Sequence, residues 1–170
     1  VPPMGRIVDD ADLCFEERGT ASYWRYITDD GYGNTLLWTH TVATAAEMDN
    51  HALWHLTFDE AGEYRVEAYT DASFAESQQA RYQVRHGGTV DTEVVDQTAF
   101  DGWVVVGSFD FAQGGDQWVR LEDHTGEALG TNTAIVFDAI RLTRLDPDPD
   151  GGVDGGTSTD GGAGSDAGDA

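Results

Sequence analysis

Short stretches in which apolar and polar residues alternate recur along the chain about every 8–15 residues. Within residues 63–70, for example, Tyr64, Val66 and Ala68 would share one face of a strand. In residues 52–58, Trp54 and Leu56 would do the same. Glycine, aspartate, asparagine and serine separate these stretches, as turns between strands require. The pattern therefore restricts the chain to a fold made of many short strands.

Eleven such stretches precede residue 146, and the only helix candidate, residues 42–48, is short and uncapped. About ten short strands with frequent turns are typical of stacked antiparallel sheets. We expect an all-β fold, a jelly-roll-like antiparallel β-sandwich of two sheets. The expected strands are 6–10, 13–17, 22–27, 35–42, 52–58, 63–70, 80–86, 92–97, 103–111, 117–123 and 134–145.

The composition changes sharply near residue 146. Residues 146–170 contain no aromatic residue and consist of Asp, Gly, Ser, Thr, Ala, Pro and one valine. Such a segment buries too little apolar surface to offset the entropy of ordering. We expect residues 1–6 to be an N-terminal linker, residues 7–145 to form the domain, and residues 146–170 to be a disordered linker.

The charge balance excludes several kinds of partner. The chain has a formal charge of −23, and residues 1–145 alone hold 25 acids against nine arginines. Nucleic acids and anionic lipids draw much of their affinity from basic residues, so we expect no nucleic-acid binding. No apolar run approaches the roughly 18 residues of a membrane-spanning helix, so we expect no membrane insertion in this segment.

One acidic residue, Asp138, lies on an apolar strand face, where burial of a carboxylate is energetically unfavourable. In residues 134–142, Asp138 shares a strand face with Val136 and Ile140, which directs it toward the core. A buried carboxylate needs a partner. An arginine or backbone N–H groups would serve, which is the simpler interpretation. The alternative is a structural calcium ion shared with Asp9 and Asp10 of "VDDAD", and also with Asp12. No other cofactor is expected.

Aromatic side chains supply the candidate ligand contacts. Trp54 and Trp103 lie on apolar faces and are expected in the core. Exposed rings can stack on sugar faces while neighbouring polar groups bind hydroxyls. The alternative is that such lone aromatics are ordinary surface residues. The candidates for ligand binding are Tyr32 in a glycine-containing loop, Tyr69 on a polar strand face, and Trp118 with Arg120 on another strand.

The stretch "VRHGGTVDTEVVDQ", residues 84–97, has the composition of a catalytic site. By period, however, residues 80–86 and 92–97 are two strands and residues 87–91 connect them, with Gly87 and Gly88 forming the turn. Ser108 lacks the setting of a nucleophile elbow, and the many acids single out no glycosidase pair. We therefore predict no catalytic residues.

Over residues 7–145 the chain resembles the golvesin/xanthan-lyase carbohydrate-binding-like domain. Seven motifs occur in the order of that family. They are "IVDD", "YW" with "GYG", "ALWHLTFDEAGEYRVEAY", "YQVRHGG", "VVDQ", "GWVVVGSFDF" and "VFDAIRL". Within this pattern His86, Gly87, Gly88, Asp96 and Gln97 mark one hairpin, and we expect them to fix its turn and the following loop by hydrogen bonds.

The resemblance implies a β-sandwich that serves as a non-catalytic accessory module of a bacterial secreted or cell-surface protein. It also implies a covalently attached upstream domain, such as a hydrolase, lyase or peptidase. The expected partner is a polysaccharide or cell-wall glycan, and the expected location is extracellular or at the cell surface. The alternative function is a structural spacer or adhesion module without affinity for small ligands.

Overall fold

The computed structural model describes residues 1–145, which form three antiparallel sheets. The four-stranded sheet has the order β1 (Arg6–Val8), β12 (Ile140–Arg144), β6 (Gly62–Thr70) and β9 (Gly102–Phe111). The five-stranded sheet has the order β2 (Phe15–Arg18), β5 (His51–Phe58), β10 (Gly114–Glu122), β7 (Ala80–His86) and β8 (Thr89–Val95). The three-stranded sheet has the order β11 (Ala134–Phe137), β4 (Thr35–His40) and β3 (Arg25–Thr28).

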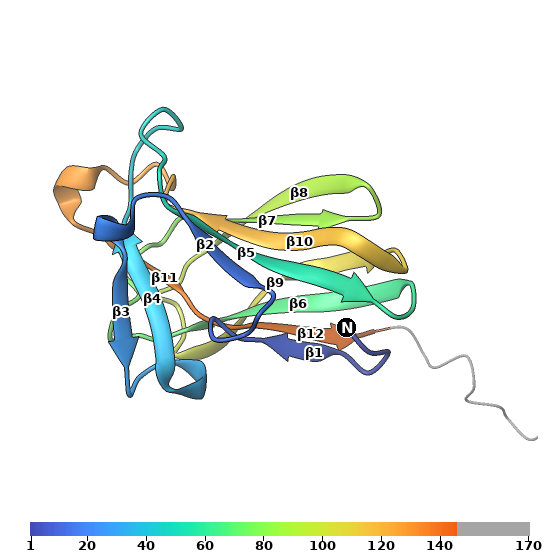
Figure 1. Ribbon diagram of the computed structural model, residues 1–170. Helices are drawn as coiled ribbons and strands as arrows, with labels where there is room; N and C mark the ends of the chain where they lie inside the picture. Colours follow the sequence, from blue (N-terminus) through green and yellow to red (C-terminus); the bar gives the residue numbers. More distant parts are fainter. Residues whose placement is uncertain (146–170) are drawn as a thin grey trace, which may run out of the picture.

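The predicted all-β sandwich is confirmed, and a small third sheet is added to it. Figure 1 shows β3 and β4 at one end, running across the direction of the longer strands β5, β6, β10 and β12. Helical structure among the described residues consists of three short 3₁₀ turns: η1 (Ala21–Tyr23), η2 (Tyr32–Asn34) and η3 (Leu129–Thr131). None of these has the length or hydrophobicity needed to cross a membrane. The expected disorder of residues 146–170 lies outside the described residues.

The core lies between the four-stranded and five-stranded sheets, and its residues follow the predicted alternation. On β6, Tyr64, Val66 and Ala68 are buried. On β5, Trp54 and Leu56 are buried with them in one hydrophobic cluster. Period two brings these side chains inward from both sheets, so removal of their apolar surface from water is the main force that holds the sandwich together.

The stretch predicted as a single strand over 134–145 is divided. The chain leaves the three-stranded sheet after Phe137 and enters the four-stranded sheet at Ile140. Asp138 and Ala139 form the corner between them and are both buried. The indole Nε1 of Trp54 donates a hydrogen bond to the Asp138 carbonyl at 3.0 Å, so the corner is fixed to the five-stranded sheet as well.

The hairpin of β7 and β8 has a tighter turn than predicted. His86 pairs with Thr89, so only Gly87 and Gly88 form the connection and β8 begins at Thr89 rather than at residue 92. Both glycines have positive φ, at 51° and 88°, as a two-residue turn between strands requires. The periodicity indicates a strand only from residue 92, whereas the ladder continues through Thr89, Val90 and Asp91.

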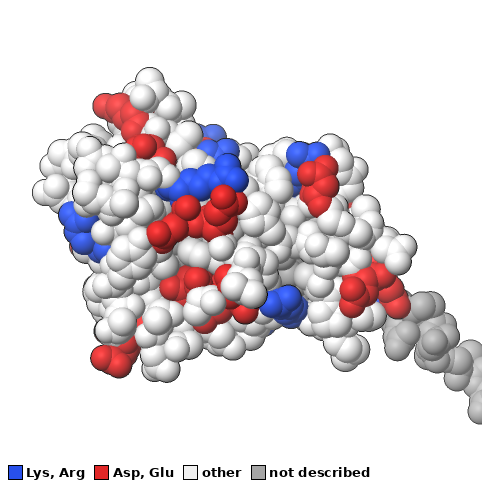
Figure 2. Space-filling model, viewed as in Figure 1, with Lys and Arg blue, Asp and Glu red and all other residues white. Residues whose placement is uncertain are grey.

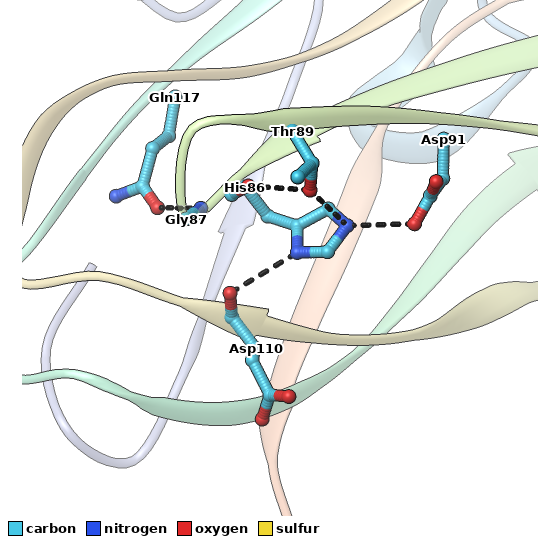
Figure 3. A network of polar contacts seen from close by, with 6 residues as sticks. All are labelled: His86, Gly87, Thr89, Asp91, Asp110 and Gln117. Carbon is cyan, nitrogen blue, oxygen red and sulfur yellow. Dashed lines mark hydrogen bonds and ion pairs between the residues drawn. The ribbon is translucent and has the colours of Figure 1, made fainter.

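His86 joins this hairpin to its neighbours, as Figure 3 shows. Its Nδ1 lies 3.1 Å from the Asp110 carbonyl, which can only accept, so Nδ1 donates. Its Nε2 lies 2.9 Å from a carboxylate oxygen of Asp91. The ring also packs against Phe109, with centroids 5.0 Å apart. His86 therefore connects β7, β8 and β9, and its contacts are those of a residue that stabilises the fold.

Gln97, just after β8, pairs with a strand in the way a backbone residue would. Its Nε2 donates to the Val136 carbonyl at 2.9 Å, and its Oε1 accepts the Val136 N–H at 3.0 Å. Nε2 also donates to the Tyr82 hydroxyl at 3.0 Å. The Gln97 side chain is fully buried, so these bonds satisfy groups that water cannot reach.

We predict that His86→Ala lowers the free energy of unfolding by about 1–3 kcal/mol, because two polar contacts and ring packing are lost. Urea unfolding measures this change. His55→Ala is the control, since His55 is 47% exposed and contacts Glu16 at the surface; its effect should stay within about 0.5 kcal/mol. Equal losses in the two variants would contradict the structural role of His86.

We predict a larger loss for Gln97→Ala, about 2–4 kcal/mol, because it leaves the buried N–H and C=O of Val136 without partners. The matched control is Gln113→Ala, which removes one exposed bond to the Asp59 carbonyl. Thermal and urea unfolding compare the two variants. A Gln97→Ala protein as stable as the Gln113→Ala protein would show that Gln97 does not link β8 to β11.

Candidate functional site

Three aromatic rings gather on the outer face of the four-stranded sheet. Tyr69 on β6 lies directly opposite Trp103 on β9, and their ring centroids are 5.2 Å apart. Tyr32 from η2 lies against both, at 5.8 Å from Tyr69 and 5.3 Å from Trp103. All three are partly exposed. We call Tyr32, Tyr69 and Trp103 the aromatic cluster.

A pair of charged residues borders the aromatic cluster. The guanidinium of Arg141 on β12 lies over the Trp103 ring, 4.5 Å from its centroid. The same guanidinium donates two hydrogen bonds of 2.8 Å to the carboxylate of Glu67 on β6. These bonds hold the pKa of Glu67 below its usual value. The face therefore presents apolar rings beside a fixed donor and acceptor pair.

Trp103 was expected in the core, and that expectation is wrong. Counting by twos from the buried Phe109 and Phe111 places Trp103 inward. The register between β6 and β9 shifts at this point, however: Val66 pairs with Gly107, while the next residue, Glu67, pairs with Val105. This bulge adds one residue to β9 and reverses the face of everything before it. Trp103 and Val105 consequently point outward.

The four predicted ligand-binding residues divide into two pairs. Tyr32 and Tyr69 meet in the aromatic cluster. Trp118 and Arg120 lie on β10, whose inward residues Val119 and Leu121 are fully buried, so this pair occupies the outer face of the five-stranded sheet. The two pairs are on opposite sides of the sandwich and cannot contact one small ligand together.

The environment of the second pair also differs from expectation. Trp118 was expected to be exposed and is half-buried, lying opposite His55 and Arg85 in the ladder. Arg120 is held by Glu122 at 3.1 Å. The ladder partners of Trp118 stand beside it on the same outer face of the sheet.

Carboxylates of Asp9, Asp10 and Asp138 meet beneath the loop that carries Tyr32. One oxygen from each lies within 4.8 Å of the others. Asp9 and Asp10 follow β1, and Asp138 occupies the corner between β11 and β12. We call these three residues the acid cluster. Asp12, the fourth acid considered for this site, lies outside it and pairs with Arg6 at 3.5 Å.

Asp138 connects the acid cluster to the aromatic cluster. The Tyr32 backbone N–H donates to Asp138 Oδ2 at 2.9 Å, whereas Asp138 Oδ1 has no hydrogen-bond partner within residues 1–145. Burial raises the pKa of Asp138 to about 8, and the charges of Asp10 and Asp9 add to the effect. Burial likewise raises the pKa of Asp9 to about 6, with Asp10 contributing. Of the two partners considered for Asp138, the backbone N–H is present.

A cavity of about 240 Å³ lies near the three-stranded sheet and was not anticipated. Its walls include Tyr23 and Leu129, which are largely exposed, and the buried Asp123. Burial raises the pKa of Asp123 to about 6. Segments that are distant in the sequence form the walls of this cavity, so no local sequence pattern predicts it.

The family model for the golvesin C-terminal domain matches residues 6–144. A search of the curated proteins finds no match. Among solved structures, a Paenibacillus xanthan lyase matches with a TM-score of 0.66 and 21% identity, over 85% of this chain and 13% of that one.

Two further structures are similar at lower identity. A Podospora anserina GH26-CBM35 β-(1,4)-mannanase matches with a TM-score of 0.55 and 11% identity, over 87% of this chain and 29% of that one. A family 35 carbohydrate binding module from Clostridium thermocellum matches with a TM-score of 0.52 and 14% identity, over 81% of this chain and 98% of that one. At these identities the likeness concerns the fold. The family match covers most of the chain, and the chain therefore belongs to the golvesin C-terminal domain family.

Proposed function

We propose that this domain is a non-catalytic accessory module that binds a polysaccharide or cell-wall glycan through the aromatic cluster. The observation that carries the proposal is the meeting of Tyr32, Tyr69 and Trp103 on one outer sheet face beside Arg141 and Glu67. Aromatic rings contact the apolar C–H faces of sugars, and fixed charged groups bind the hydroxyls at the edges.

The position of the cluster supports this assignment. Two of its rings stand on paired strands, so their spacing is set by the ladder rather than by a loop. Val105, which is 55% exposed, extends the apolar surface along β9. Together these residues offer an apolar strip with hydrogen-bonding groups at its margin, which suits an extended chain of sugar units better than a single buried one.

The domain is much shorter than the enzymes that it resembles in fold. The chain spans only 13% of the xanthan lyase and 29% of the mannanase that it resembles in fold, whereas it spans 98% of the isolated carbohydrate binding module. We propose that it is attached to an upstream domain in a secreted or cell-surface bacterial protein, such as a hydrolase, lyase or peptidase. Its role there is to hold that domain near its glycan.

The acidic surface limits which glycans fit. Residues 1–145 carry 25 acids against nine arginines, and Figure 2 shows acidic groups spread over the visible face with arginines beside some of them. Such a surface repels polyanions at low ionic strength. Neutral polysaccharides are therefore the preferred class, and strongly acidic ones should bind only at high salt.

We predict that Trp103→Ala weakens binding to the preferred glycan at least tenfold, equivalent to about 1.4 kcal/mol, because the largest ring of the platform is lost. Affinity gel electrophoresis against neutral and acidic polysaccharides and peptidoglycan identifies the glycan, and titration calorimetry measures the affinity. Tyr32→Ala should weaken binding in the same direction.

Trp118→Ala is the matched control, since it removes a half-buried tryptophan from the opposite face. It should leave affinity unchanged, as should His86→Ala in its folded form. Loss of binding in Trp118→Ala alone would move the site to the five-stranded sheet, and loss in Tyr23→Ala alone would move it to the cavity. Binding to no glycan in the panel would favour a structural spacer or adhesion module instead.

A further inference from the structure

The acid cluster places three carboxylates together without a compensating arginine or histidine from the described residues. Within residues 1–145, none of the ion pairs formed by arginine or histidine involves Asp9, Asp10 or Asp138. We infer that these three residues bind a calcium ion, which fixes the loop carrying Tyr32 to the corner at Asp138. This inference is independent of whether the domain binds a glycan.

The spacing of the oxygens fits one shared ion. Calcium binds oxygen ligands at about 2.3–2.6 Å, so two ligands of one ion lie at most about 5 Å apart. The three carboxylate oxygens lie within 4.8 Å of one another. They come from two segments far apart in the sequence, residues 9–10 and residue 138, so the arrangement is produced by the fold and is not a local run of acids.

The burial of Asp138 is an independent reason to expect a cation. The residue is 2% exposed, and its Oδ1 has no hydrogen-bond partner in the part of the chain that the structure describes. A buried carboxylate oxygen without a donor is costly. The Tyr32 N–H satisfies Oδ2, while Oδ1 belongs to a side chain that lies among the other two carboxylates. A bound cation would satisfy this oxygen and offset the repulsion among the three acids.

The loop above the cluster is built to approach the carboxylates closely. Gly31 and Gly33 both have positive φ, at 83° and 67°. A Cβ atom at Gly33 would lie 2.6 Å from Asp9 Oδ2, and one at Gly31 would lie 2.8 Å from Asp138 Oδ2. A side chain at either position would therefore intrude on the acids. The hydroxyl of Thr35 also donates to Asp10 Oδ1 at 2.8 Å, which orients that carboxylate.

The ligand chemistry selects calcium among the common divalent cations. The three side chains offer only oxygen, whereas structural zinc sites use cysteine and histidine. Magnesium requires near-ideal octahedral geometry and usually keeps several waters, so a site made of carboxylates from two segments suits it less well. Calcium accepts irregular geometry and six to eight oxygens, which waters and loop carbonyls can complete.

The test is calcium titration of the EDTA-treated 170-residue chain, followed by scanning calorimetry and by titration calorimetry. Calcium at about 100 times its Kd should raise Tm by roughly 5–10 °C. Asp138→Asn should abolish both the shift and the heat of binding. Without calcium, Asp138→Asn should melt no lower than the metal-free wild type, because the amide replaces a buried carboxyl group that is costly without a cation, and its oxygen can still accept from the Tyr32 N–H. In amide NMR spectra, calcium should shift the Tyr32 resonance of the wild type.

The control for general charge screening is Asp116→Asn, which makes the same change at a carboxylate that is 79% exposed and distant from the cluster. It should keep the full calcium response. If Asp138→Asn does not fold, Asp10→Asn tests the same site, and it should weaken calcium binding at least tenfold. A response that is equal in the cluster and control variants, or equal with magnesium, would overturn the inference, as would no response at all.

Discussion

The corner at Asp138 and Ala139 is the junction on which the arrangement of the sheets depends. There the chain passes from the three-stranded to the four-stranded sheet. The Asp138 carbonyl accepts from the Trp54 indole of the five-stranded sheet, and the Ala139 carbonyl accepts from the Tyr69 N–H at 2.8 Å. Through its carboxylate the same residue also holds Tyr32. Two residues therefore connect three sheets and the loop that carries Tyr32.

A second set of buried polar contacts closes the sandwich at the end of β8. A glutamine side chain carries the same donor and acceptor groups as a peptide unit, so Gln97 extends hydrogen bonding from β8 to Val136 without another strand. Each of these bonds adds only about 1 kcal/mol in net terms, but leaving its partners unpaired costs more. Such contacts specify which sheet edges meet, while apolar burial supplies most of the stability.

The sequence predicted the strands because their inward residues repeat with a period of two, and it identified Asp138 because a carboxylate interrupted that repeat. It misplaced Trp103 because the bulge at Val106 changes the parity of β9, and single-sequence alternation carries no sign of one extra residue. The sequence pattern placed Tyr32, Tyr69 and Trp118 in one set of ligand-binding candidates, because local alternation indicates only which side chains leave the core. Which sheet face a residue shares with another depends on long-range pairing. The third sheet and the cavity near Tyr23 depend on such pairing too.

The two clusters differ in how firmly the fold sets them. Tyr69 and Trp103 stand on neighbouring strands of a sheet whose other face is buried, so any change in their spacing would disturb the core. Tyr32 belongs to η2 and not to a strand, and its position depends on a loop with two glycines at positive φ. That loop is held by hydrogen bonds to Asp138, Asp71 and Asp10. The stability of the acid cluster therefore decides whether the aromatic cluster has two rings in fixed positions or three.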